Sequence, residues 1–124
     1  MTLADRAAAF AAAFPKYQAA WPRVVEEGGK PVLYATWLMG NDYRTRSTFY
    51  GAYPHGYLPR VMAMFPDAQP SRTLHVFSGS LPEGPYLRCD LRQDAELACS
   101  VYDLPGQMPA PFRLVLADPP YSAA

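Results

Sequence analysis

The chain has 124 residues, half of them hydrophobic, which suits one domain with a buried core and excludes a disordered composition. Eleven basic residues balance eleven acidic ones, so the formal net charge at pH 7 is zero. Because a neutral chain is a poor electrostatic fit to a phosphate backbone, DNA is a partner that the charge does not support.

The N-terminal residues predict a helix. Apolar residues recur at helical spacing from Leu3 to Phe14, and Asp5 suits the first turn. Pro15 either ends this helix or begins a second one that runs through Trp21.

The next segments alternate between turn residues and apolar runs. Gly28, Gly29 and Pro31 indicate a loop. The run PVLYATWL, residues 31–38, is either a buried strand or a short helix, because its periodicity does not decide between them.

A long polar and aromatic stretch, MGNDYRTRSTFYGAYPHGY (residues 39–57), predicts an ordered loop. We expect His55 in this loop to make hydrogen bonds. The run YLPRVMAMF, residues 57–65, has apolar spacing typical of a short helix, and Pro59 is tolerable in its first turn.

The pattern changes to short strands from Thr73 onward. The four strand candidates are TLHVFS (73–78), PYLRCDL (85–91), LACSVYD (97–103) and FRLVLAD (112–118). Since the run RLVLA, residues 113–117, is continuous rather than alternating, it predicts a strand covered on both faces in a parallel sheet. His75 lies within the first candidate and is expected to be a hydrogen-bonded core residue.

Two cysteines, Cys89 and Cys99, fall in these strand candidates. They would form a disulfide in a secreted chain and two packed free thiols in a reducing compartment. We favour free thiols in the cytoplasm, because the Ala-rich N-terminal stretch has no basic leader before an apolar block. No apolar run approaches the roughly twenty residues of a membrane span, so no membrane association is expected.

The C-terminal half carries motifs in a defined order: LHVFSGS, YLRCDL, SVYDLP and ADPPY. In this order the half resembles the S-adenosylmethionine-dependent amino-methyltransferases of DNA, especially small phage-encoded methylase-like proteins. The resemblance implies S-adenosylmethionine as cofactor and a bacterial or phage-infected cytoplasm. It implies that Phe77, Ser78 and Gly79 line the methionine end of the cofactor, that Asp90 binds the ribose hydroxyls, and that Asp103 binds the adenine amino group.

The same resemblance identifies the segment Asp118, Pro119, Pro120 and Tyr121 as the catalytic motif. An exocyclic amino group is a weak nucleophile, since its lone pair is conjugated with the ring. Asp118 and the Pro119 carbonyl would accept its two N–H bonds, and Asp118 would stabilise the charge that develops. Tyr121 would stack on a base flipped out of the duplex. No metal is expected.

Two features depart from that family. Only GSLPEGP, residues 79–85, separates the first two strand candidates, whereas a parallel crossover normally needs a dozen residues or more. We therefore expect either an unusually short crossover or an antiparallel pair.

The second departure is that the sequence stops just after the catalytic motif. This suggests the first half of the fold, as a natural short form, half of a split enzyme or a truncated chain. We expect the strand 112–118 to have an open edge, which pairs with residues 31–38, with a second copy, or with another protein.

These observations predict an α/β fold with a partial Rossmann-like sheet of about four strands. We expect a single domain, with a helical, loop-rich region over 1–70 and the half sheet over 71–124. The expected function is that of a DNA adenine methyltransferase-like protein, with activity of the isolated chain in doubt. The alternative is a non-enzymatic protein derived from a methyltransferase, which inhibits a host protein, for example one of a defence system, through the open sheet edge.

Overall fold

The computed structural model describes residues 1–39, 53–54, 56–108 and 111–117. Most of the predicted loop, including His55, lies outside the described residues, as does the segment 118–124. The contacts between residues divide the chain into two compact units. Unit 1 is Met1–Gly40 with His55–Asp67, and unit 2 is Asn41–Pro54 with Ala68–Ala124. The single domain with a boundary near residue 70 stays a prediction.

Unit 1 begins with the predicted helix, α1 (Leu3–Ala13). The Thr2 side chain accepts a hydrogen bond from the Asp5 amide, and the Asp5 carboxylate accepts one from the Thr2 amide, which closes a capping box. The helix ends before Pro15. No second α-helix follows in the described residues up to Trp21, where only a 3-10 turn forms, η1 (Gln18–Ala20).

An antiparallel hairpin follows, formed by β1 (Arg23–Glu27) and β2 (Lys30–Tyr34). The loop predicted from Gly28, Gly29 and Pro31 is a two-residue turn of Gly28 and Gly29, and Pro31 lies in β2. Both glycines have positive φ, at 60° and 78°, as a two-residue turn between twisted strands requires. Of the two alternatives for residues 31–38, the strand is the one that forms, as far as Tyr34.

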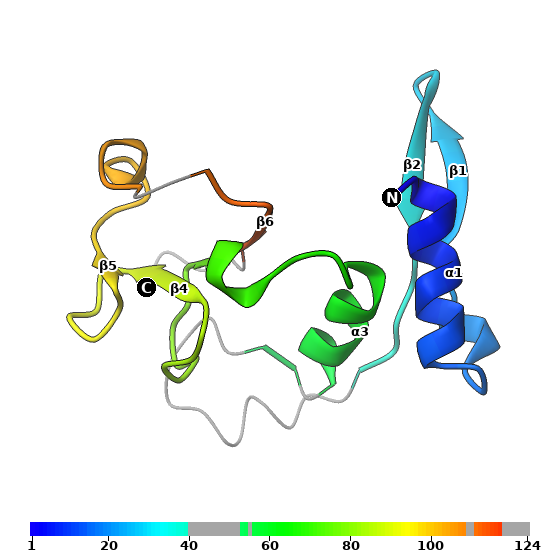
Figure 1. Cartoon of the computed structure of the whole chain (residues 1–124), viewed down its shortest axis with the longest axis horizontal. Helices are drawn as coiled ribbons and strands as arrows, with labels where there is room; N and C mark the ends of the chain where they lie inside the picture. Colours follow the sequence, from blue (N-terminus) through cyan, green and yellow to red (C-terminus); the bar gives the residue numbers. More distant parts are fainter. Residues whose placement is uncertain (40–52, 55, 109–110, 118–124) are drawn as a thin grey trace. The chain divides into compact units, whose positions relative to one another are not determined.

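The predicted short helix is present as α3 (Tyr57–Met64). Within unit 1, α1 contacts both α3 and the hairpin, and it runs along the hairpin in Figure 1. Phe10 on α1 is completely buried and stacks on Trp37, with ring centroids 5.7 Å apart. The core of unit 1 therefore forms around an aromatic pair that joins α1 to the segment after β2.

Unit 2 contains a four-stranded sheet in the order β5-β4-β3-β6, with every neighbouring pair parallel. Its strands are β3 (Thr73–Val76), β4 (Leu87–Asp90), β5 (Leu97–Ala98) and β6 (Leu114–Ala117). The α/β prediction is confirmed at this level, and the antiparallel alternative for the first pair is wrong. The third strand is shorter than predicted, because the chain turns after Ala98. Two 3-10 turns, η2 (Pro70–Arg72) and η3 (Leu104–Gly106), complete the unit.

The prediction that β6 is covered on both faces is wrong. Leu114 and Leu116 are buried, whereas Val115 between them is 53% exposed. A run of Leu, Val and Ala reads the same whether one face or two are covered, so the sequence did not reveal the open face.

The open edge of β6 does not receive the N-terminal apolar segment, so this part of the prediction is also wrong. Residues 31–34 belong to β2, which pairs with β1 instead. In the described sheet β6 pairs with β3 alone and is the last strand in the order. A second copy or another protein remains as a predicted partner of this edge.

The core of unit 2 joins strands to the turns that follow them. It is made of Leu74, Val76, Cys89, Cys99 and Leu104. Both cysteines are buried free thiols, as favoured from the sequence. Burial, together with the neighbouring Cys99, raises the pKa of Cys89 to about 11, so its thiol stays protonated and unreactive at neutral pH. Among the described helices, none is long and apolar enough to cross a membrane.

Candidate functional site

The candidate site lies at the carboxyl edge of the parallel sheet. All four strands run in the same direction, so the residues that follow them meet along one edge. Phe77, Ser78 and Gly79 come directly after β3, and Asp90 is the last residue of β4. In open α/β sheets this edge is where ligands usually bind.

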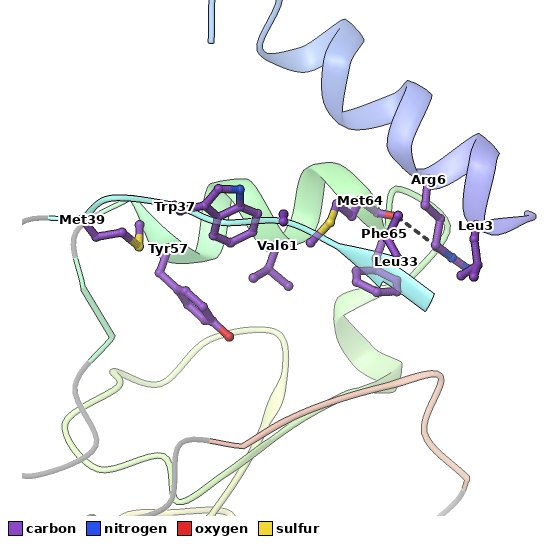
Figure 2. Close-up of a pocket in the computed structure, with 10 residues that line it drawn as sticks. Leu3, Arg6, Leu33, Trp37, Met39, Tyr57, Val61, Met64 and Phe65 are labelled. Atoms are coloured by element: carbon purple, nitrogen blue, oxygen red, sulfur yellow. Dashed lines mark hydrogen bonds between the residues drawn. The ribbon is translucent and has the colours of Figure 1, made fainter. Parts of the chain in front are cut away.

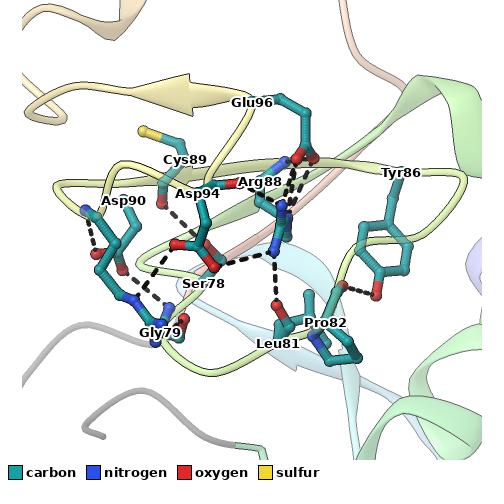
Figure 3. A network of polar contacts seen from close by, with 11 residues as sticks. Ser78, Gly79, Leu81, Pro82, Tyr86, Arg88, Cys89, Asp90, Asp94 and Glu96 are labelled. Atoms are coloured by element: carbon teal, nitrogen blue, oxygen red, sulfur yellow. Dashed lines mark hydrogen bonds and ion pairs between the residues drawn. The ribbon is translucent and has the colours of Figure 1, made fainter.

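Asp90 ties the ends of β3 and β4 together (Figure 3). Its Oδ2 accepts a hydrogen bond from the Gly79 amide at 2.8 Å, and its Oδ1 accepts one from the Arg92 amide at 3.1 Å. The Arg92 guanidinium donates to the Gly79 carbonyl at 3.0 Å. The structure therefore brings two predicted site residues, Gly79 and Asp90, into direct contact, and adds Arg92, which the sequence reading missed.

The turn after β3 has an unusual backbone. Phe77 and Gly79 both have positive φ, at 57° and 54°. This conformation is natural for glycine and uncommon for phenylalanine, whose ring here packs against the core of unit 2. Backbone strain of this kind, of order 1–3 kcal/mol, is often found at functional sites.

Ser78, between these two residues, is buried. Its amide donates to the Cys89 carbonyl at 3.2 Å, and its hydroxyl lies 3.5 Å from the same oxygen. With only 2% of the residue exposed, the Ser78 side chain supports the turn rather than facing a ligand.

The other predicted site residues are further along the chain. Asp103 is exposed, follows β5 and precedes η3, and its backbone hydrogen bonds join it to Ser100 and Gly106 rather than to Gly79 or Asp90. Its side chain makes no capping hydrogen bond to η3. The catalytic candidates Asp118, Pro119, Pro120 and Tyr121 follow β6 in the sequence and lie outside the described residues.

A buried ion pair supports this edge from within β4 (Figure 3). The Arg88 side chain is 5% exposed, and its Nη2 lies 2.6 Å from Oε2 of Glu96. The Arg88 Nε also donates to both Glu96 oxygens, at 3.2 and 3.0 Å, and the Arg88 amide donates to Oε1 at 3.1 Å. These hydrogen bonds from Arg88 hold the pKa of Glu96 below its usual range. An arginine within an apolar strand candidate, followed by the acids of RQDAE, was the sequence signal for this pair.

The same arginine also binds the backbone of the short crossover between β3 and β4 and that of the link after β4. Its Nη1 donates to the Leu81 carbonyl at 3.0 Å, and its Nη2 donates to the Asp94 carbonyl. Within the link, the Tyr86 hydroxyl donates to the Pro82 carbonyl at 2.6 Å. Side chains thus satisfy backbone carbonyls that a helix would otherwise pair internally.

His75 occupies the middle of β3 and is 3% exposed, as predicted for a core residue. Its Nδ1 lies 2.9 Å from the Tyr53 hydroxyl, and its ring packs edge-on against Tyr86 at 4.6 Å between centroids. Burial lowers the pKa of His75, so the neutral imidazole is favoured. These contacts indicate a structural role.

The residues at the sheet edge fit a ligand with hydroxyl and amino groups. A carboxylate has about four acceptor positions, and Asp90 uses two of them for amides. The remaining two suit a pair of adjacent hydroxyls, as on a ribose. The exposed Asp103 carboxylate offers further acceptors. Within the described part of the chain, no three His, Cys, Asp or Glu side chains gather as a metal site would need.

Comparisons of the chain with protein-family models, with curated proteins and with solved structures found no match.

Proposed function

We propose that this chain is an S-adenosylmethionine-binding, DNA adenine methyltransferase-like protein that carries the cofactor-binding part of a Rossmann-like fold. One observation carries the proposal. The motif-bearing strands form an all-parallel sheet in the order β5-β4-β3-β6, and the candidate residues follow the carboxyl ends of β3, β4 and β5. This order, with β4 and β5 on one side of β3 and β6 on the other, supports a relation to doubly wound sheets, whose ligand site lies at the switch point.

The switch point lies between β3 and β6, and the turn after β3 has the backbone of a ligand-binding turn. The positive φ of Gly79 and the strain at Phe77 support a functional role for this turn. The proposed division of roles differs from the sequence expectation at Ser78, which we assign to support of the turn because it is buried.

In the proposed site Asp90 accepts the two ribose hydroxyls with its two unused positions, and Asp103 accepts the adenine amino group. The bound cofactor supplies the methyl group. Asp118 and the Pro119 carbonyl orient the target amino group, Pro120 fixes the turn, and Tyr121 stacks on the target base.

Calorimetric titration of S-adenosylmethionine into the purified chain tests cofactor binding. We expect a micromolar dissociation constant that Asp103→Ala weakens about tenfold, since one lost hydrogen bond to a charged group is worth about 1.5–3 kcal/mol. Asp90→Asn is expected to weaken binding at least as much. Glu27→Gln removes an exposed carboxylate from β1 and serves as the matched control, with binding unchanged.

Folding must be separated from binding for the Asp90 variant, because Asp90 also holds Gly79 and Arg92. Asp103 has no such role, so its variant is the cleaner test. Absence of any heat at millimolar cofactor, with the wild-type chain folded, would refute the proposal. Binding without methyl transfer to DNA would restrict it to the cofactor-binding role.

The open edge of β6 favours a second candidate function, a methyltransferase-derived protein that inhibits a host protein by strand addition. Val115 on this edge strand is 53% exposed. Such a protein would keep its inhibitory activity after Asp118→Ala and lose it after Val115→Lys, whereas the enzyme would show the reverse. A homodimer formed through the same edge is a third possibility, and sedimentation velocity tests it: wild type would then sediment as a dimer and Val115→Lys as a monomer.

A further inference from the structure

A pocket in unit 1 lies among residues that the proposed function does not use. Its volume is about 610 Å³, and its walls come from α1, β2, the segment after β2, and α3 (Figure 2). This volume falls within the range of about 300–1,000 Å³ typical of small-molecule sites. All of the lining residues belong to unit 1, so the pocket is a property of that unit alone.

The lining is aromatic and rich in sulfur. It includes the rings of Trp37, Tyr57 and Phe65 and the thioethers of Met39 and Met64. Trp37 and Tyr57 pack edge-on, with centroids 6.3 Å apart and planes at 70°, so their rings present differently oriented walls. Polarisable thioethers and ring faces are well suited to contact a further aromatic ring.

The charge in the lining is compensated. Arg6 is the charged side chain of the wall, and its Nη1 and Nη2 lie 2.8 and 3.1 Å from the two oxygens of Asp67. The Arg6 Nη1 also donates to the Met64 carbonyl, and the guanidinium carbon lies over the Phe65 ring, 4.6 Å from its centroid. A charged ligand would therefore lose its hydration without gaining an unpaired counter-charge from this side chain.

The indole nitrogen of Trp37 is also occupied, since it donates to the Ala20 carbonyl at 3.0 Å. What Trp37 offers a ligand is therefore apolar ring surface rather than a hydrogen-bond donor. From these contacts we propose that the pocket binds an uncharged, flat aromatic small molecule. The charged amino, carboxylate and sulfonium groups of S-adenosylmethionine do not suit this lining, so the proposal goes beyond the cofactor site proposed above.

The probe pair 2-naphthol and 2-naphthoate tests the proposal, since the two share a ring system and differ in charge at pH 7. NMR of the ¹⁵N-labelled full chain follows the two indole N–H signals, from Trp37 at the pocket and Trp21 outside its lining. We expect 2-naphthol to shift the Trp37 signal saturably and to leave Trp21 in place. We expect 2-naphthoate to bind at least about tenfold more weakly.

Two variants locate the binding. Ala35→Phe places a ring in the pocket and should weaken 2-naphthol at least about tenfold. Should that variant fail to fold, Met39→Ala removes a thioether from the wall and should weaken binding several-fold. Met62→Ala is its matched control, because Met62 lies on α3 outside the lining, and it should bind as wild type.

Three results would each overturn the proposal: no saturable shift of Trp37, equal binding of naphthol and naphthoate, or equal effects of Met39→Ala and Met62→Ala. Competition separates this site from the proposed function. Saturating S-adenosylmethionine should leave 2-naphthol bound, and displacement would show that the two ligands share one site. If the chain does not bind S-adenosylmethionine, the binding of 2-naphthol to the pocket in unit 1 is still expected, so the two proposals can fail separately.

Discussion

Removing the carboxylate of Glu96 is expected to destabilise unit 2 strongly. In Glu96→Ala the Arg88 guanidinium stays in place, 5% exposed, without the carboxylate that accepts from its Nε and Nη2. The Arg88 amide also loses its acceptor. A buried charge without its partner costs far more than the pair contributes over apolar residues, because the charge has lost its hydration and gained nothing in return.

The magnitude follows from the contacts that remain. Breaking a buried ion pair costs about 3–5 kcal/mol. Here Arg88 keeps the carbonyls of Leu81 and Asp94, and the Asp94 carboxylate lies 3.8 Å from its Nη1. Glu96 is itself 28% exposed. We therefore expect a cost somewhat below that range, about 2–3 kcal/mol. With a urea dependence of roughly 2 kcal/mol per molar, the unfolding midpoint should fall by about 1–1.5 M.

Pulsed thiol labelling across a urea series measures this loss in the right unit. Cys89 and Cys99 are both buried in the core of unit 2, so they react only when that core opens. The two tryptophans, Trp21 and Trp37, lie in unit 1, and their fluorescence reports that unit. Their transition should move less than the labelling transition if the two units unfold separately.

Asp94→Ala is the matched control, since it removes the same charge from the same link. The Asp94 side chain is 58% exposed, and its carboxylate is the more distant partner of Arg88. A loss of at most about 1 kcal/mol is expected. Equal losses for Glu96→Ala and Asp94→Ala, or a Glu96→Ala chain within about 0.5 kcal/mol of wild type, would refute the reasoning.

Three further outcomes are expected. Since burial keeps the folded-state pKa of His75 below 6.5, the stabilising effect of this residue is complete above pH 6.5 and declines by at most about 1.4 kcal/mol per pH unit below it. Urea midpoints of wild type and His75→Gln between pH 7.5 and 5 check this, and parallel pH profiles of the two chains would contradict it. The folded-state pKa of Glu96 lies below 4.5, so its contribution to stability is complete above pH 4.5 and is lost as the pH falls through the folded-state value. Glu96→Gln should therefore make unfolding less dependent on pH in acid, as followed by circular dichroism. Gly29→Ala should cost about 1 kcal/mol in unit 1, because the φ of 78° at this turn residue strains a side chain even with open space around it. Tryptophan fluorescence in urea measures this cost, and Glu27→Ala in the adjacent strand β1 should cost less.

Local patterns in the sequence identified most of the elements. The helices over 3–14 and 57–65 and the strand starting at Thr73 were predicted because spacing, caps and prolines act within a few residues of each other. The turn at Gly28 and Gly29 is just as local, and the sequence indicated a loop there, although it did not show that Pro31 belongs to β2.

The burial of β6 and the partners of charged residues were not local in this sense. Val115 is exposed and Arg88 is buried, although the hydrophobicity of the two side chains predicts the reverse. What covers each side chain depends on the order of the strands, and strand order pairs residues that are far apart in the chain. The ion pair between Arg6 and Asp67 is likewise not predictable from local sequence, because the two residues lie near opposite ends of the sequence of unit 1.

By itself, then, the sequence determined the α/β character, the approximate positions of the helices and strands, and the candidate residues Gly79 and Asp90. Only the tertiary structure decided that the first two strands run parallel and that Asp90 holds the Gly79 amide. The physical reason is that periodicity and turn chemistry act along the chain, whereas strand direction depends on contacts across it. One such contact is that of the Arg88 guanidinium, which joins the Leu81 carbonyl of the crossover to Glu96, beyond β4.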